Sequence, residues 1–201
     1  MDALALTFSS GWASGINAYL VVLVLGIADR VGSVGEIPDV LGRWDVLAVA
    51  GFLYVMEFIA DKIPYIDSTW DAISTAIRPS VGAVIGLLLA GDVSTLEQAL
   101  YAVLGGGAAL ASHTVKAGLR LAVNTSPEPV TNATTSVGED LGVATVVLLA
   151  VTYPWIALTV ALVLFGVGVW LLVYLLTRIR RGWRRWRAWR ENRVQQGVPR
   201  S

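Results

Sequence analysis

The sequence predicts an all-α membrane protein, a polytopic helical bundle of about six spans. Hydrophobic residues make up 55% of the 201-residue chain and the mean hydropathy is +0.65, values that a soluble domain rarely reaches. Apolar stretches recur at lengths near the ~20 residues that a helix needs to cross a bilayer. The chain has no cysteine and one histidine, which excludes a disulfide framework and argues against a zinc site.

Six apolar stretches are the candidate spans, and they divide the chain into a membrane domain (1–176) and a tail (177–201). In chain order they cover residues 11–28, 46–60, 70–91, 96–119, 131–151 and 154–176. The third contains Pro79, which predicts an interruption. The pair Tyr153-Pro154 leaves open whether the last two are separate crossings or one bent element.

Two polar segments interrupt this pattern at matching positions. Residues 61–79 and 124–140 each follow an apolar span, and the apolar stretches after them, 81–90 and 141–151, are too short to cross alone. Polar groups at membrane depth need protein or a water-filled cavity around them. Paired interruptions of this kind are typical of transporters with a site between two halves.

The two interruptions belong to a possible internal repeat. Residues 74–90 align with residues 134–150 at a shift of 60, so that Thr75 meets Thr135 and Gly82 meets Gly142. Because successive spans cross the membrane in opposite directions, spans three and five would run in the same direction, and the repeat would be a same-sense one. Convergence of Ala/Gly/Val-rich helices is the alternative.

Basic residues predict the orientation. Nine of the fifteen Lys and Arg lie in 177–201, so six spans would place both termini in the cytoplasm of a bacterial inner (plasma) membrane. The outer loops would then carry two basic residues, Arg30 and Arg43. The cytoplasmic loops would carry four, and with the nine of the tail the cytoplasmic side would have thirteen. These four are Lys62, Arg78, Lys116 and Arg120. Both interruptions would open toward the cytoplasm.

The first interruption contains the densest group of charges. Asp67 and Asp71 are four residues apart and share a helical face with Arg78, so that the stripe would suit a cation and its anionic ligand. A solvated loop helix is the alternative. Asp61 and Lys62 complete the candidates of this segment.

The second interruption is rich in acceptors. Its candidate residues are Asn124, Asn132, Glu139 and Asp140. Glu139 and Asp140 would lie at membrane depth, which is costly without partners. The repeat alignment places Arg78 beside them, so we expect Arg78 to pair with Glu139 or Asp140, either around a ligand or as a structural ion pair.

Four further polar residues lie within or at the ends of spans. Glu57 and His113 near the ends of spans two and four would suit a proton relay, although a lone histidine is more often simply hydrogen-bonded. Lys116 follows His113 within a turn. Asn17 is the strongly polar side chain of span one and would line the same cavity or cap a broken helix.

The tail alternates arginine with tryptophan, which is typical of a helix on an anionic membrane surface. The surface residues would be Trp183, Arg184, Trp186, Arg187 and Trp189. Next to a final span, this pattern favours lipid over nucleic acid.

The chain resembles a bacterial membrane family catalogued as domain-of-unknown-function 4126. The stretches that carry the resemblance are SGINAYLVVLVLGIADR (14–30), EFIADKIPYIDSTWDAISTAIRPSVGA (57–83) and HTVKAGLRLAVNTSPEPVTNATTSVGED (113–140). The resemblance implies a small multi-span inner-membrane protein and brings no activity with it.

The sequence therefore favours a small transporter or channel-like protein for a charged solute, with a cytoplasm-open polar site between spans two to five and no cofactor. Its small size suggests a homodimer. One alternative is an enzyme acting on a lipid head group through carboxylate-bound Mg²⁺. The other is a non-catalytic assembly or lipid-organising protein.

Overall fold

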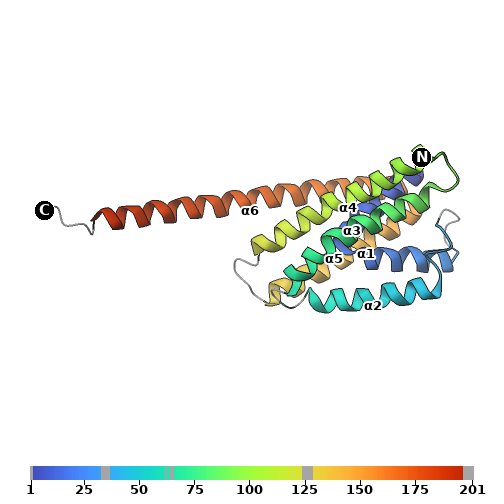
Figure 1. The fold of residues 1–201 in the computed structure, drawn as a ribbon, viewed down its shortest axis with the longest axis horizontal. Coiled ribbons are helices and arrows are strands. Elements are labelled where there is room, and N and C mark those ends of the chain that lie inside the picture. Colours follow the sequence, from blue (N-terminus) through green and yellow to red (C-terminus); the bar gives the residue numbers. More distant parts are fainter. Residues whose placement is uncertain (1, 33–36, 62, 64–65, 124–128, 197–201) are drawn as a thin grey trace.

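The computed structural model describes residues 2–32, 37–61, 63, 66–123 and 129–196, with the side chains of 67–68, 122–123, 129–132 and 185–196 outside the description. Within these ranges the chain forms helices and no strand, which confirms the all-α prediction. The helices are α1 (Asp2–Arg30), α2 (Trp44–Ala60), α3 (Ile66–Ala90), α4 (Thr95–Val123), α5 (Pro129–Thr152) and α6 (Pro154–Gln196) (Figure 1).

Helices α2 to α6 alternate in direction along one bundle axis (Figure 1). Helices α5 and α6 are separate antiparallel elements that meet at Tyr153, which answers the question left open by the sequence. Helix α6 continues past residue 176 without a break and projects well beyond the bundle. We call this projecting side the tail end and the opposite side, where the chain starts, the N-terminal end.

Helix α1 is broken at its middle. Asn17 has φ −148° and ψ 94°, which is extended backbone inside an otherwise helical stretch. Its side-chain Oδ1 accepts a hydrogen bond from the backbone N–H of Leu20 at 3.0 Å, the geometry of an N-cap. Asn17 therefore ends one helix, 2–16, and starts a second, 18–30.

The two halves of α1 return to the same end of the bundle. The first residues of α1 are near the start of α6, because the Trp155 indole N–H donates to Asp2 at 2.9 Å. Its last residue, Arg30, donates to the carbonyl of Gly42 at 2.8 Å, and Gly42 precedes α2 at that same end. The predicted first span is thus a re-entrant hairpin rather than a single crossing, and the two chain termini lie at opposite ends of the bundle (Figure 1).

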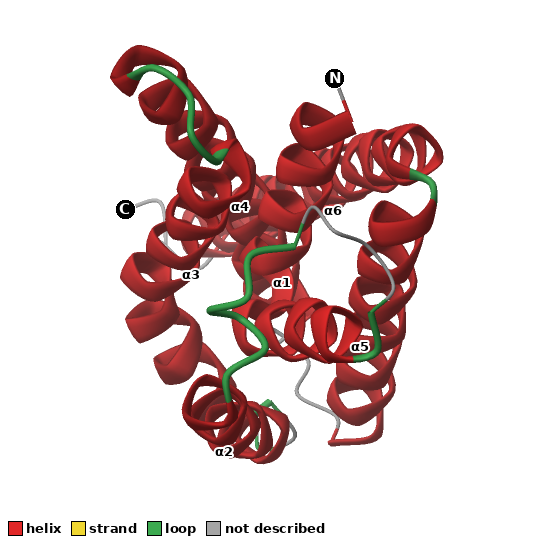
Figure 2. Cartoon of the chain, turned by 90° about the vertical axis from the view of Figure 1, so that its right-hand side faces the viewer, coloured by secondary structure: helices red, strands yellow, loops and turns green. Residues whose placement is uncertain are grey.

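Helix α1 also forms the centre of the bundle. Viewed from the N-terminal end, the other helices surround it (Figure 2), and it contacts all five. Glycines make this packing close: a Cβ at Gly11 or Gly82 would collide with the backbone of Gly105 on α4. Small residues at such crossings let helix backbones approach in a membrane.

The outer surface has the character expected of a membrane protein. Within the described residues, four helical stretches are long and apolar enough to cross a bilayer, namely Asp2–Arg30, Thr69–Ala90, Ala133–Thr152 and Pro154–Arg184. Large apolar side chains such as Phe52, Val103 and Trp170 point outward. Because α1 turns back, the bundle axis is traversed by α2 to α6, five helices rather than the six predicted crossings.

The predicted interruptions differ from the observed one. Pro79 lies inside α3, which stays helical from Ile66 to Ala90. Much of the second polar segment forms the first turns of α5. Both helices run in the same direction, as a same-sense repeat requires, and the repeat itself stays a prediction (Figure 1). The helix break falls at Asn17, which confirms the expectation that this residue could cap a broken helix.

Candidate functional site

Seven charged side chains gather inside the bundle beside the break of α1. Six of them are at most 6% exposed, and the seventh, Glu139, has a side chain that is 19% exposed. We call this group the charge network; it consists of Glu57, Asp61, Asp71, Arg78, Lys116, Arg120 and Glu139. Its residues come from α2 and its C-cap Asp61, and from α3, α4 and α5, and Lys116 joins the group to α1 through the carbonyl of Ile16.

Arg78 forms the deepest ion pairs of the network. Its Nη2 lies 2.6 Å from Glu57 Oε1 and its Nη1 lies 3.0 Å from Asp71 Oδ1. Glu57 lies on α2, whereas Asp71 lies on α3 like Arg78 itself, and all three residues are buried. The predicted pairing of Arg78 with Glu139 or Asp140 is wrong, because Arg78 extends toward α2 and its own helix instead of toward α5.

His113 lies between Arg78 and Thr75. Arg78 Nη1 is 2.8 Å from His113 Nδ1, and His113 Nε2 is 2.9 Å from Thr75 Oγ1. A guanidinium donates and does not accept, so Nδ1 is the acceptor and the neutral ring carries its proton on Nε2. Both ring nitrogens are then engaged away from Glu57, which supports the simpler hydrogen-bonding role over the predicted carboxylate relay.

Lys116 places its ammonium among three acids and a helix end. Its Nζ donates to the carbonyl of Ile16 at 2.7 Å and lies 3.2, 3.5 and 3.8 Å from Glu139, Asp61 and Glu57. Ile16 closes the first half of α1, where the unsatisfied carbonyls carry a partial negative charge. The first half of α1 thus supplies a carbonyl oxygen that accepts a hydrogen bond from the Lys116 ammonium.

Arg120 completes the network from the tail side. Its Nη2 lies 2.8 Å from both Asp61 and Glu139, and its Nε lies 3.9 Å from Asp71. Lys116 and Arg120 are four residues apart and share a face of α4. They were expected in a cytoplasmic loop, together with Arg78, and the structure corrects this: all three are inside the bundle.

Asp140 lies on the other side of the break. The Asn17 amide donates to its Oδ1 at 2.9 Å, and the Tyr54 hydroxyl donates to its Oδ2 at 3.3 Å. Asn17 thus caps the second half of α1 with one atom and binds a carboxylate with another. The second half begins here, and its N-terminus favours a nearby anion.

Most of the predicted site residues converge. The structure brings together Asn17, Glu57, Asp61, Asp71, Arg78, His113, Lys116, Glu139 and Asp140. Asp67 and Asn132 lie on α3 and α5 with side chains outside the description, and Lys62 and Asn124 lie outside the described residues. In the tail, Trp183 and Arg184 are exposed, while the side chains of Trp186, Arg187 and Trp189 are outside the description.

Two residues at the site were missed: Arg120 of the charge network, and Tyr54, which binds Asp140. Arg120 was treated as a loop charge, although its spacing of four from Lys116 placed it on the same helical face. Tyr54 was not considered, although it precedes Glu57 by one turn of α2. Spacing relative to a known site residue would have identified both.

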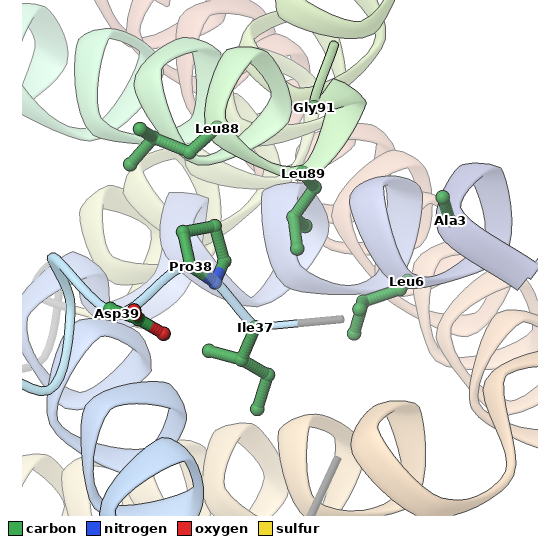
Figure 3. Close-up of a pocket in the computed structure, with 8 residues that line it drawn as sticks. All are labelled: Ala3, Leu6, Ile37, Pro38, Asp39, Leu88, Leu89 and Gly91. Atoms are coloured by element: carbon green, nitrogen blue, oxygen red, sulfur yellow. The ribbon is translucent and has the colours of Figure 1, made fainter. Parts of the chain in front are cut away.

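Two hollows reach side chains of the charge network, and a third lies apart from it. One of about 140 Å³ reaches Lys116 and Glu139 between α1, α4, α5 and α6, and one of about 290 Å³ reaches Asp71 and Arg120 between α3 and α4. A larger hollow of about 570 Å³ opens at the N-terminal end, where Leu6, Ile37 and Leu89 face it (Figure 3).

An apolar helical bundle with a re-entrant central helix and a buried charge network defines a polytopic membrane protein. The chain belongs to the family described as a domain of unknown function (DUF4126), whose model matches residues 4–174. This confirms the predicted family. No curated protein and no solved structure matches the chain.

Proposed function

We propose that this protein is a small transporter or channel-like protein, with its site at the charge network around the break of α1. The observation that carries the proposal is the broken central helix, whose two inner ends contact Lys116 and Asp140. Half-helices that end at membrane depth against charged groups are a recurrent solution for binding and releasing ions.

The energetics of the network support a functional role. Burying seven charged groups is expensive even when they are paired, and an apolar core of equal volume is often as stable. A network kept only for stability would therefore have a cheaper substitute. The carboxylates each have a lysine or arginine within ion-pair distance among the seven, which gives the lipid head-group enzyme no specific support.

We further propose that the tail end faces the cytoplasm and the N-terminus faces the opposite side. The nine tail arginines favour the cytoplasm by the positive-inside rule, and α6, which contains eight of them, projects from the bundle at that end. The Arg/Trp pattern would then contact anionic lipids of the inner leaflet of the plasma membrane. The absence of native cysteines makes this orientation accessible to single-cysteine labelling.

Flux measurements in liposomes test the proposed function. Purified protein would be reconstituted, and movement of protons, alkali-metal ions, inorganic anions and amino acids would be followed under imposed ion gradients. We expect the wild type to move one of these and Glu139→Gln to lose most of that flux, because Lys116 and Arg120 lose a shared partner. Thr159→Val, at an exposed hydroxyl of α6, is the control and should behave as wild type.

A folded wild type that moves none of these species, with Glu139→Gln changing only stability, would contradict the proposal. It would instead favour the assembly or lipid-organising alternative, in which the ion pairs hold the helices in register.

A further inference from the structure

Among the described residues, the charges inside the bundle do not balance. With His113 neutral, the network and Asp140 contribute three positive and five negative groups. The bases are Arg78, Lys116 and Arg120; the acids are Glu57, Asp61, Asp71, Glu139 and Asp140. An uncompensated charge inside a bundle is costly, so a site with this excess gains from binding positive charge.

Asp140 is the acid with the weakest compensation. The hydrogen bonds described for its two oxygens come from neutral donors, Asn17 and Tyr54, whereas each acid of the network lies within 4 Å of a lysine or arginine. Tyr54 lies one helical turn before Glu57, whose second oxygen, Oε2, is fully buried and has no hydrogen-bond partner in the described part of the chain. The oxygens of Tyr54 and Glu57 on α2 and of Asp140 on α5 are thus available as ligands beside the break of α1.

The N-terminal end of the bundle is also acidic. Its described residues include six acids and two bases: Asp2, Asp29, Asp39, Asp45, Asp92, Glu97, Arg30 and Arg43. The 570 Å³ hollow opens at this end, and Asp39 lies on its wall (Figure 3). A mouth of one charge sign concentrates ions of the opposite sign.

Hydroxyl groups lie between the hollow and the network. Thr7, Ser10 and Ser14 are spaced three and four apart, so they share a face of the first half of α1, and all are fully buried. Ser14 donates to the carbonyl of Arg78 at 3.1 Å, whereas the hydroxyls of Thr7 and Ser10 have no partner in the described structure. Buried oxygens without partners are groups that an ion or water can satisfy.

We infer that the species bound at this site is a small monovalent cation, a proton or an alkali-metal ion, held at Asp140 beside Tyr54 and the free oxygen of Glu57. This inference rests on the proposed function and names its substrate class. Tyr54, Asp61 and Lys116 are the charged and titratable groups nearest to Asp140 in the described part of the chain. The other such groups beside the break of α1 are Tyr19, Glu57, Asp71, Arg78, His113, Arg120 and Glu139.

Thermal unfolding of the purified full chain in detergent tests the inference. Lithium, sodium or potassium chloride would replace choline chloride at constant ionic strength, at one acidic and one neutral pH. A ligand that binds only the folded state raises the unfolding midpoint by mass action. We expect a cation-dependent or proton-dependent shift in the wild type and in Thr159→Val that is lost in Asp140→Asn. Shifts with one alkali-metal ion would identify that ion, and a shift with pH alone would identify the proton.

A second variant covers the case in which Asp140→Asn does not fold. Tyr54→Phe keeps the carboxylate and removes one oxygen, so that it should need a higher cation concentration for the same shift. A shift that follows the anion, or a cation shift that is unchanged in Asp140→Asn and Tyr54→Phe, would overturn the inference. A cation shift without flux in liposomes would contradict transport and leave the cation site standing.

Discussion

Replacing Arg78 with methionine is expected to destabilise the protein by about 3–5 kcal/mol, the usual cost of removing one partner from a buried ion pair. The guanidinium is 1% exposed and pairs with Glu57 and Asp71, both of which are buried. Methionine fills much of the same volume, so the loss reports the stranded carboxylates rather than a cavity. Chemical or thermal unfolding in detergent measures the change.

Arg43 provides the matched control for Arg78. Its Nη2 lies 2.6 Å from Asp45, the same distance as in the Arg78–Glu57 pair, but both side chains are more than 60% exposed. Arg43→Met is therefore expected to leave the stability close to that of the wild type, because water screens an exposed ion pair. The double variant Arg78→Met/Glu57→Gln should recover part of the stability lost in Arg78→Met. Equal effects of Arg43→Met and Arg78→Met would show that the network is hydrated and not buried.

Gly15→Ala is expected to be the most damaging of the conservative glycine substitutions, with a loss of about 1–3 kcal/mol or more. A Cβ at Gly15 would collide with the carbonyl of Ala109 and the hydroxyl of Ser112, both on α4. The backbone carbonyl cannot move without displacing α4, and Gly15 is two residues before the break. The same unfolding measurement applies, and the flux of the variant should fall with its stability.

Gly107 and Gly138 are the controls for this substitution, because no atom lies within 4 Å of a Cβ at either position. Alanine there removes the conformational freedom of glycine from a helix and is expected to be neutral or stabilising by about 0.5–1 kcal/mol. A Gly15→Ala protein as stable as these two would mean that α1 and α4 do not pack closely.

The sequence was sufficient for the fold class and for most of the residues that converge. Asp71, Arg78, Lys116 and Glu139 were identified because charges in apolar helices need partners, whichever partners those are. The pairing itself was not predictable, since it depends on which helices adjoin. The repeat alignment placed Arg78 opposite α5, whereas the packing of α2 against the second half of α1 brings Glu57 to it.

The re-entrant hairpin was missed for a physical reason. Residues 2–30 contain no proline and are apolar enough to span a membrane. The break depends on Asn17, whose side chain satisfies both the N–H of Leu20 and the carboxylate of Asp140, and Asp140 is more than a hundred residues away in the chain. Local propensity offered only the small residues Gly11 and Gly15 and a lone asparagine. Pro79, the stronger local signal, leaves α3 helical because neighbouring helices hold it.

The reversal of α1 determines how the charge network is reached. It is tested most directly by finding whether the two ends of α1 lie on the same side of the membrane. Single cysteines would replace Asp2, Val31 and Arg184, all exposed, in a chain with no other thiol, and a membrane-impermeant maleimide would be applied to intact cells. We expect Asp2→Cys and Val31→Cys to react from outside, and Arg184→Cys to react only after the membrane is opened. Labelling of Asp2→Cys and Val31→Cys from opposite sides would make α1 a simple crossing and contradict the re-entrant site.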